Sequence, residues 1–222
     1  MRDFNAIESA VIDRFGGEAE LVQHLTKPKT ARAIKKIPDN RWLSEASKAV
    51  MQAGFNWKVV EKKWPRIEEI FHDFDLHFCS FLPDEGLEDV MKQEGMIRHW
   101  AKTKAIRDNA TFFLELSRAH GGLGSYFAGW DSDNYADNLQ YLRKGGARLG
   151  GRTAQVFLRR MGVDTLIFSN DMVVALVREG VVQKTPSSKK DWAALKEAVA
   201  TWQQQSGRSL NEISQILAYS VG

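Results

Sequence analysis

The chain has 222 residues, 43% of them hydrophobic and 27% charged, with a formal net charge of +3. This length can bury a sizeable core without disulfides, and a single cysteine, Cys79, excludes an internal disulfide framework and a zinc site built on several thiolates. The N-terminal segment lacks the apolar run of a secretory signal, and no stretch reaches the ~18 apolar residues of a membrane span. We therefore expect a cytoplasmic protein with no membrane partner.

Helical patterns follow one another along the first half of the chain. Apolar residues recur at helical spacing, and glycine or proline marks the ends of most segments. Pro28 is expected to start a basic helix, and Gly54 to end a long apolar one. The predicted helices cover residues 7–15, 21–25, 27–37, 42–53, 57–63, 65–71 and a segment that begins at Pro83.

The second half is also predicted to be helical. Glycines between residues 121 and 129 indicate a loop region there, and Ser209 with Glu212 forms the pattern of a capping box at the start of the last helix. The predicted helices cover residues 97–117, 152–160 and 169–177, and two more follow a short linker at 186–188. Convincing strands with alternating polarity are absent, so the predicted fold class is all-α.

A glycine turn from Leu149 to Ala154 joins two predicted helices. No Asp or Glu occurs between Asn138 and Val163, and the same stretch contains six arginines and lysines. A glycine turn at a helix start lets backbone N–H groups approach an anion, so the stretch is typical of a clamp for DNA phosphates. An ordinary connection with a solvated basic face explains these residues equally well.

The turn also resembles the helix-hairpin-helix of base-excision glycosylases, which typically reads Leu-Pro-Gly-Val-Gly-x-Lys-Thr-Ala. Gly150 matches the second glycine, and Thr153 matches the threonine before the alanine. Arg148 stands at the first glycine, and Arg152 at the lysine. Bifunctional members use that lysine as a Schiff-base nucleophile, whereas an arginine stays protonated. The resemblance therefore implies a monofunctional enzyme with water as the nucleophile.

Further motifs make the resemblance more specific. Gln52-Ala-Gly-Phe-Asn-Trp57 is similar to Gln-Ala-Gly-Leu-Ser-Trp, and Phe71-His-Asp-Phe-Asp75 to Phe-His-x-Phe-Asp. Gly95-Met-Ile-Arg-His-Trp-Ala-Lys102 is similar to Gly-Ile-Ile-Arg-His-x-x-Lys, and Asn170-Asp-Met-Val-Val174 to Asn-Asp-His-Val-Val. In this order and at these spacings, residues 42–177 resemble the DNA-3-methyladenine glycosylase I family.

The resemblance implies a two-lobed helix-hairpin-helix glycosylase fold. Residues 1–222 are expected to form a single bilobal domain, with the family-like core at 42–177, the hairpin near 146–154, and flanking helices at 1–40 and 187–222. The implied activity is excision of an alkylated base, such as 3-methyladenine, from double-stranded DNA after base flipping. We expect the protein to act as a monomer.

The resemblance also assigns roles to particular residues. A flipped base needs an aromatic platform and polar groups for its edge. Trp57 matches the tryptophan that stacks on the base, although a core residue just past a helix end is the alternative reading. The further candidates for the base pocket are Trp42, Glu45 and Gln52. The candidates for binding the DNA backbone are Arg98, Lys102, Arg148, Gly150, Gly151, Arg152 and Thr153.

The chain departs from the family at several positions. The base-reading glutamate of the family falls on Ala49, and Glu45 lies one helical turn earlier on the same face. The family's zinc ligands fall on Met172 and Leu176, so we expect no zinc and no other cofactor. The His- and Asp-rich segment 72–77 matches no metal motif in its spacing, and a structural turn and cap are predicted there.

A catalytic carboxylate is predicted near the hairpin. Other glycosylases of the superfamily place an aspartate about eighteen residues after the hairpin lysine, where it stabilises the oxocarbenium ion or activates water. That count reaches Asn170, beside Asp171, and Asp164 lies in a second matching motif. Asp171 is the preferred candidate, although an aspartate there is also typical of a helix N-terminus.

Three hypotheses remain open from the sequence. The first is a monofunctional DNA glycosylase, and the second is a DNA-binding protein that kept the scaffold and lost catalysis, as Ala49 would allow. The third is a helical protein with no role on DNA. Steep salt dependence of duplex binding separates the third hypothesis from the others, and base excision separates the first from the second.

Overall fold

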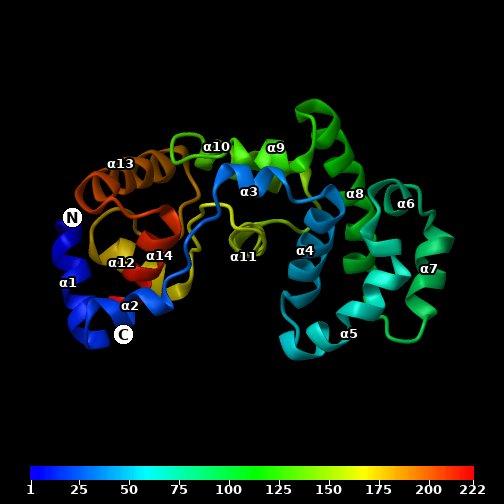
Figure 1. Cartoon of the computed structure of the whole chain (residues 1–222), viewed down its shortest axis with the longest axis horizontal. Helices are drawn as coiled ribbons and strands as arrows, with labels where there is room; N and C mark the ends of the chain where they lie inside the picture. Colours follow the sequence, from blue (N-terminus) through cyan, green and yellow to red (C-terminus); the bar gives the residue numbers. More distant parts are fainter. The chain divides into compact units, whose positions relative to one another are not determined.

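The computed structural model describes residues 1–222, and all its regular elements are helices (Figure 1). No helix combines the length and the apolar character that crossing a bilayer requires. The absence of strands confirms the all-α prediction. The α-helices are α1 (Phe4–Phe15), α2 (Glu18–His24), α3 (Ala31–Lys35), α4 (Asp39–Gln52), α5 (Trp57–Ile70), α6 (Leu76–Ser80), α7 (Asp84–Lys92), α8 (Trp100–His120), α9 (Leu123–Ala128), α10 (Tyr135–Gly145), α11 (Gly151–Met161), α12 (Asn170–Arg178), α13 (Lys189–Ser206) and α14 (Leu210–Tyr219), and a 3₁₀ helix, η1, spans His72–Phe74.

Most of the predicted helix ends are confirmed. Gly16 ends α1 in the left-handed conformation, with φ 81°, where glycine has no steric penalty. Ser209 and Glu212 form the predicted capping box of α14. Ser169 caps α12, because its side chain accepts a hydrogen bond from the backbone N–H of Met172.

Two predicted helix boundaries around prolines are wrong. The basic helix α3 starts at Ala31 behind Thr30, whose hydroxyl accepts from the Ala33 N–H, and not at Pro28. Residues 57–70 form one helix through Pro65 rather than two. Trp64 and Ile67, on either side of the proline, are both buried, and this packing keeps the helix continuous although Pro65 donates no hydrogen bond.

The glycine-rich region after α8 is a helix, α9, and not the predicted loop. Its first N–H group, at Leu123, donates to a carboxylate oxygen of Asp39 at 2.9 Å. A Cβ added to Gly124 would lie 2.8 Å from the carbonyl oxygen of Ile34. Gly124 therefore permits a close approach between the backbones of α9 and α3, which a sequence pattern does not reveal.

The chain divides into two compact units, in agreement with the predicted two-lobed fold. The first unit contains residues 1–29, 130–138 and 162–222, and the second contains residues 30–129 and 139–161. The expected family-like core at 42–177 thus draws residues from both units, and its limits stay a prediction.

The core of the second unit lies between α4, α8, α9 and α11. Trp42 is fully buried there and stacks on Phe127, with ring centroids 4.3 Å apart. Phe157 of α11 meets Trp42 edge-on at 6.0 Å. This packing corrects the prediction for Trp42: its indole is a core residue and is not available to a base.

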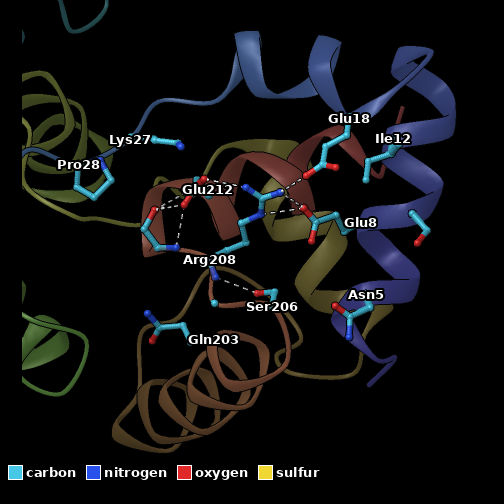
Figure 2. Close-up of a pocket in the computed structure, with 13 residues that line it drawn as sticks. Asn5, Glu8, Ile12, Glu18, Lys27, Pro28, Gln203, Ser206, Arg208 and Glu212 are labelled. Atoms are coloured by element: carbon cyan, nitrogen blue, oxygen red, sulfur yellow. Dashed lines mark hydrogen bonds and ion pairs between the residues drawn. The ribbon is translucent and has the colours of Figure 1, made fainter.

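The first unit contains α1, α12, α13 and α14 and holds a cluster of charged side chains around Arg208 (Figure 2). The guanidinium of Arg208 lies 2.6 Å from a carboxylate oxygen of Glu8, 3.1 Å from one of Glu212 and 3.6 Å from one of Glu18. An open hollow lies beside this cluster, and Glu8, Glu18, Arg208 and Glu212 all line it. The cluster therefore ties α1 and α2 to the start of α14.

A second ion-pair cluster in the first unit surrounds Glu179, just after α12. Its side chain is only 2% exposed and receives hydrogen bonds from Arg2 and Arg178. Burial alone would raise the pKa of Glu179, but the hydrogen bonds from Arg2 and Arg178 outweigh it and hold the pKa at about 2. Arg2 is thereby fastened to the end of α12.

The segment after α5 makes the predicted turn and cap. His72, Asp73 and Phe74 all have positive φ, between 50° and 59°, which is rare for residues other than glycine. The carbonyl oxygen of Asp73 accepts hydrogen bonds from Asn40 and Arg41. Asp75 then caps α6 by accepting from the N–H of Phe78.

Candidate active site

A cavity of about 220 Å³ lies in the second unit, where the end of α4, the start of α5 and the first turns of α11 meet. Gly54, with φ 68°, makes the turn that brings α5 back beside α4. The residues that line the cavity are Ala49, Gln52, Ala53, Gly54, Trp57, Arg152, Thr153 and Val156. The predicted base-stacking residue, Trp57, and two residues of the predicted DNA clamp, Arg152 and Thr153, thus line the same cavity.

Trp57 is held in place by the start of its helix. Asn56 caps α5 by accepting a hydrogen bond from the N–H of Lys58 at 3.0 Å, which places Trp57 in the first helical position. The indole is 44% exposed although it lines the cavity. Part of the Trp57 ring is therefore accessible from outside the chain.

Arg160 supports this wall from the last turn of α11. Its guanidinium carbon lies 4.8 Å from the centroid of the Trp57 ring, which is a cation–π distance. The same guanidinium donates to Glu45 at 3.0 Å and to the side-chain oxygen of Gln52 at 2.6 Å. The amide nitrogen of Gln52 in turn donates to Glu61 at 3.5 Å.

This arrangement gives the predicted pocket residues distinct places. Gln52 and Trp57 line the cavity, whereas Glu45 reaches it only through Arg160. Ala49, at the position of the family's glutamate, lines the cavity with a methyl group. Arg160 was missed as a site residue. The sequence did contain a signal for it: Arg160 follows Thr153 and Val156 at helical spacing, which places the three residues on one face of α11.

The predicted hairpin lies between α10 and α11. Arg148 has φ 58°, so this arginine adopts the left-handed conformation that the family motif assigns to glycine. A Cβ added to Gly150 or Gly151 would meet no atom within 4 Å. The backbone at the start of α11 is therefore open to a close-approaching group, and the first N–H groups of a helix have no intrahelical acceptor.

The hairpin is held by a side chain from α8. The buried amide of Asn109 accepts from the N–H of Ala147 at 2.7 Å and donates to the Ala147 carbonyl at 3.0 Å. Gly145 and Gly146 allow the chain to pack against Phe112 and Leu142, because an added Cβ would lie under 3.0 Å from atoms of these residues. The loop conformation is thus fixed from outside the loop.

Lys102 has a structural role instead of the predicted role in binding DNA. Its amine donates to the carbonyl oxygens of Met51 and Ala53, at 3.0 and 2.7 Å, and so caps the end of α4. Burial lowers the pKa of the Lys102 amine, and the positive charge of Arg148 lowers it further. Arg98 is exposed and lines a different hollow, together with Trp100.

The three candidates for a catalytic carboxylate or its neighbour all belong to the first unit. Both carboxylate oxygens of Asp164 accept backbone hydrogen bonds, from Leu210 at 3.0 Å and Asn211 at 2.8 Å. Asp164 therefore supplies acceptors for the first two N–H groups of α14, beside the capping box of Ser209 and Glu212. Asn170 and Asp171 are exposed in the first turn of α12, whose cap is Ser169.

An all-helical chain with a hairpin before α11 has the architecture of the helix-hairpin-helix DNA glycosylases. A model of the family described as methyladenine glycosylase matches residues 19–148, more than half of the chain. The chain therefore belongs to the methyladenine glycosylase family. The match includes the wall of the cavity from α4 and α5 and ends in the hairpin.

One known relative matches a limited segment of the chain. It is 34% identical to DNA-3-methyladenine glycosylase 1 of Escherichia coli (strain K12) over 67 residues, which are 30% of this chain and 36% of that protein. The chain thus spans about a third of that relative's length.

Two solved structures share the fold over nearly the whole chain. The 8-oxoguanine DNA glycosylase of Thermotoga maritima has a TM-score of 0.57 at 19% identity, and the comparison covers 97% of this chain and 96% of that one. The 8-oxoguanine glycosylase/lyase of Methanocaldococcus jannaschii, solved with a 15mer DNA containing 8-oxoguanine, has a TM-score of 0.51 at 17% identity, over 95% and 94% of the two chains.

Proposed function

We propose that the protein is a monofunctional DNA glycosylase that removes an altered base after flipping it from the duplex. The observation that carries the proposal is the cavity in the second unit, which has the half-exposed indole of Trp57 on one side and the hairpin residues Arg152 and Thr153 on the other. A base stacked on Trp57 would thus lie next to the element that holds its own backbone.

The hairpin would bind the DNA backbone. Arg148 and Arg152 are exposed and take part in no ion pair within the chain, so both charges are available to phosphates. The open backbone at Gly150 and Gly151 allows a phosphate to approach the first N–H groups of α11. Binding should therefore weaken steeply with salt.

The chemical step is hydrolysis of the N-glycosidic bond. The bond breaks with its electron pair going to the leaving base, the oxygen of a water molecule bonds to C1′, and the water loses a proton. Asp171 remains our candidate to stabilise the developing oxocarbenium ion or accept that proton, and Asn170 its neighbour. Asp164 is no longer a candidate, because its two oxygens are occupied by the N–H groups of α14.

Arg152 stands where a bifunctional enzyme has its lysine nucleophile. A protonated guanidinium forms no Schiff base, so the DNA strand should stay intact after the base is released. The name of the E. coli relative makes methylated adenine the first precedent for the altered base, and alkylated bases are the class to test first.

The test is release of free base from duplexes that carry single alkylated bases. We expect release with strand cleavage only after alkali treatment, and its loss in Trp57→Ala and Asp171→Ala. Release of no base from a broad lesion panel would reject the enzyme. Strand cleavage without alkali would reject the monofunctional mechanism alone.

A repurposed DNA-binding protein is the second candidate, and Ala49 favours it. The methyl group lies where the family's base-reading glutamate is expected, so an interaction with the base is missing. This candidate predicts salt-dependent duplex binding that Arg148 and Arg152 carry, with no base release.

A further inference from the structure

The cavity beside Trp57 differs in charge from a site built to hold a positively charged base. We infer that it selects altered bases that are uncharged as nucleotides and present oxygen or nitrogen acceptors, over bases such as N3-methyladenine and N7-methylguanine that carry a positive charge in DNA. This inference rests on the proposed function and narrows the substrate class of the same site.

The first observation is that no carboxylate lines the cavity. Ala49 contributes a methyl group, and two acids on α4 and α5, Glu45 and Glu61, already have partners within the chain. Glu45 pairs with Arg160 at 3.0 Å, and Glu61 accepts a hydrogen bond from the amide of Gln52. A cationic base in this cavity would lose water without gaining an ion-pair partner, which is costly.

The second observation is that the one charged side chain lining the cavity is positive. Arg152 lines it, is exposed and has no ion-pair partner in the chain. Arg160 lies over the Trp57 ring and uses the attraction of that ring for a cation, while its own charge is balanced by Glu45. A cationic base in the cavity would therefore meet the unpaired guanidinium of Arg152, and it would share the attraction of the Trp57 ring for cations with Arg160.

A neutral base meets the opposite situation. A guanidinium is a donor only and carries five N–H groups, so Arg152 can contact a phosphate through some of them and the oxygen or ring-nitrogen acceptors of an uncharged base through others. Stacking on an indole does not depend on a charge on the base. The donors that repel a cation thus become the groups that recognise a neutral edge.

The experiment compares matched duplexes with one altered base each. The cationic set contains N3-methyladenine and N7-methylguanine, and the neutral set contains 1,N6-ethenoadenine, O6-methylguanine and hypoxanthine. Single-turnover release is divided by the spontaneous release of each base. We expect the rate enhancement for the best neutral base to exceed that for either cationic base by roughly tenfold or more.

Each outcome bears on a different statement. A larger rate enhancement for a cationic base than for every neutral base would overturn the inference, but the protein would still be a DNA glycosylase. Release of no base would overturn the proposed function, and this inference with it.

Variants of the cavity wall test the role of charge directly. Ala49→Glu introduces a carboxylate, and Ala49→Gln introduces a side chain of the same size without charge. We expect Ala49→Glu to raise the ratio of cationic to neutral release by roughly tenfold relative to Ala49→Gln. Equal ratios in the two variants would overturn the inference.

Ala49 is only 5% exposed, so a larger side chain there could disturb packing. A second variant therefore changes an exposed residue instead. Arg152→Gln removes an exposed charge and should also raise the ratio of cationic to neutral release. Any loss of backbone affinity is common to both substrates and cancels in the ratio. An unchanged ratio in Arg152→Gln would also count against the inference.

Discussion

Two arginines, Arg208 in the first unit and Arg152 in the second, are used differently. Arg208 in the first unit is 18% exposed and faces Glu8, Glu18 and Glu212, so its charge is fully engaged within the chain (Figure 2). Arg152 in the second unit is exposed on the hairpin and pairs with no acid. The first arrangement holds helices together, and the second leaves a charge for a partner outside the chain. Substitutions should therefore separate stability in the first unit from activity in the second.

The largest effect is expected for Arg208→Ala. The substitution removes the cation that Glu8 and Glu212 face, and both carboxylates are largely buried. Removing one partner of a buried ion pair lowers the free energy of unfolding by about 3–5 kcal/mol. Urea denaturation followed by circular dichroism measures this loss. Lys196→Ala is the control in the same unit, because its ion pair is exposed and should contribute less than about 1 kcal/mol. Similar losses in the two variants would contradict the role of the cluster.

The charge of Glu179 should make the first unit sensitive to acid. Its folded-state pKa, about 2, lies below its ordinary value of 4.5, so its contribution is complete above pH 4.5 and is lost as the pH falls toward 2. That contribution is on the order of 3 kcal/mol. Unfolding free energies measured between pH 7 and pH 2 should show a smaller acid-induced loss in Glu179→Gln. If the unfolding free energies of the unsubstituted protein and of Glu179→Gln depended on pH in the same way, the ion pair of Glu179 with Arg2 would contribute nothing to stability.

Trp57→Ala tests the opposite behaviour in the second unit. Loss of a stacking platform should raise the activation free energy of base release by about 1–3 kcal/mol, which lowers kcat/KM by roughly fivefold to 150-fold. The unfolding free energy should change by less than about 0.5 kcal/mol beyond the loss of the Arg160 contact, because the indole is half exposed. A large loss of stability with normal release would make Trp57 a packing residue.

Asp164 and Asp171 provide a matched pair within the first unit. Asp164→Ala removes the acceptors of the first two N–H groups of α14 and should cost about 1 kcal/mol of stability, with release per folded molecule unchanged. Asp171→Ala should leave stability nearly unchanged and reduce release. Thermal denaturation and single-turnover kinetics of both variants distinguish these roles, and the reverse pattern would exchange the assignments.

Arg148→Gly should have the smallest effect on stability and a specific effect on DNA binding. Glycine relieves the left-handed backbone of Arg148, a gain of about 1 kcal/mol that its greater flexibility in the unfolded chain offsets. Loss of one phosphate contact should reduce the slope of log affinity against log salt concentration by about 1. Fluorescence anisotropy at several salt concentrations measures the slope. An unchanged slope would remove Arg148 from the interface.

The sequence predicted the helices and the motifs better than it predicted contacts. The caps at Gly16, Ser169 and Ser209 were predictable because they depend on neighbouring residues. The helix at residues 123–128 was missed because Gly124 serves a contact with α3, about ninety residues earlier in the chain.

The same limit applies to the candidate site. Trp57 and Gln52 were predicted to lie at a pocket, and both line the cavity. Arg160 was missed because its partners Glu45 and Gln52 are more than a hundred residues away in the sequence. Lys102 was assigned to DNA because a motif gives a residue type and not the carbonyl groups that surround its amine.

The amide of Asn109 has a consequence for how such hairpins vary between proteins. Because it holds both backbone groups of Ala147 from a neighbouring helix, the loop does not depend on its own residues alone for its conformation. The position occupied by Arg148 is thereby free to exchange a small residue for a charged one while keeping the same path. A hairpin of this kind can therefore follow the same path with an arginine where the motif has its first glycine, provided that a neighbouring helix supplies such an amide.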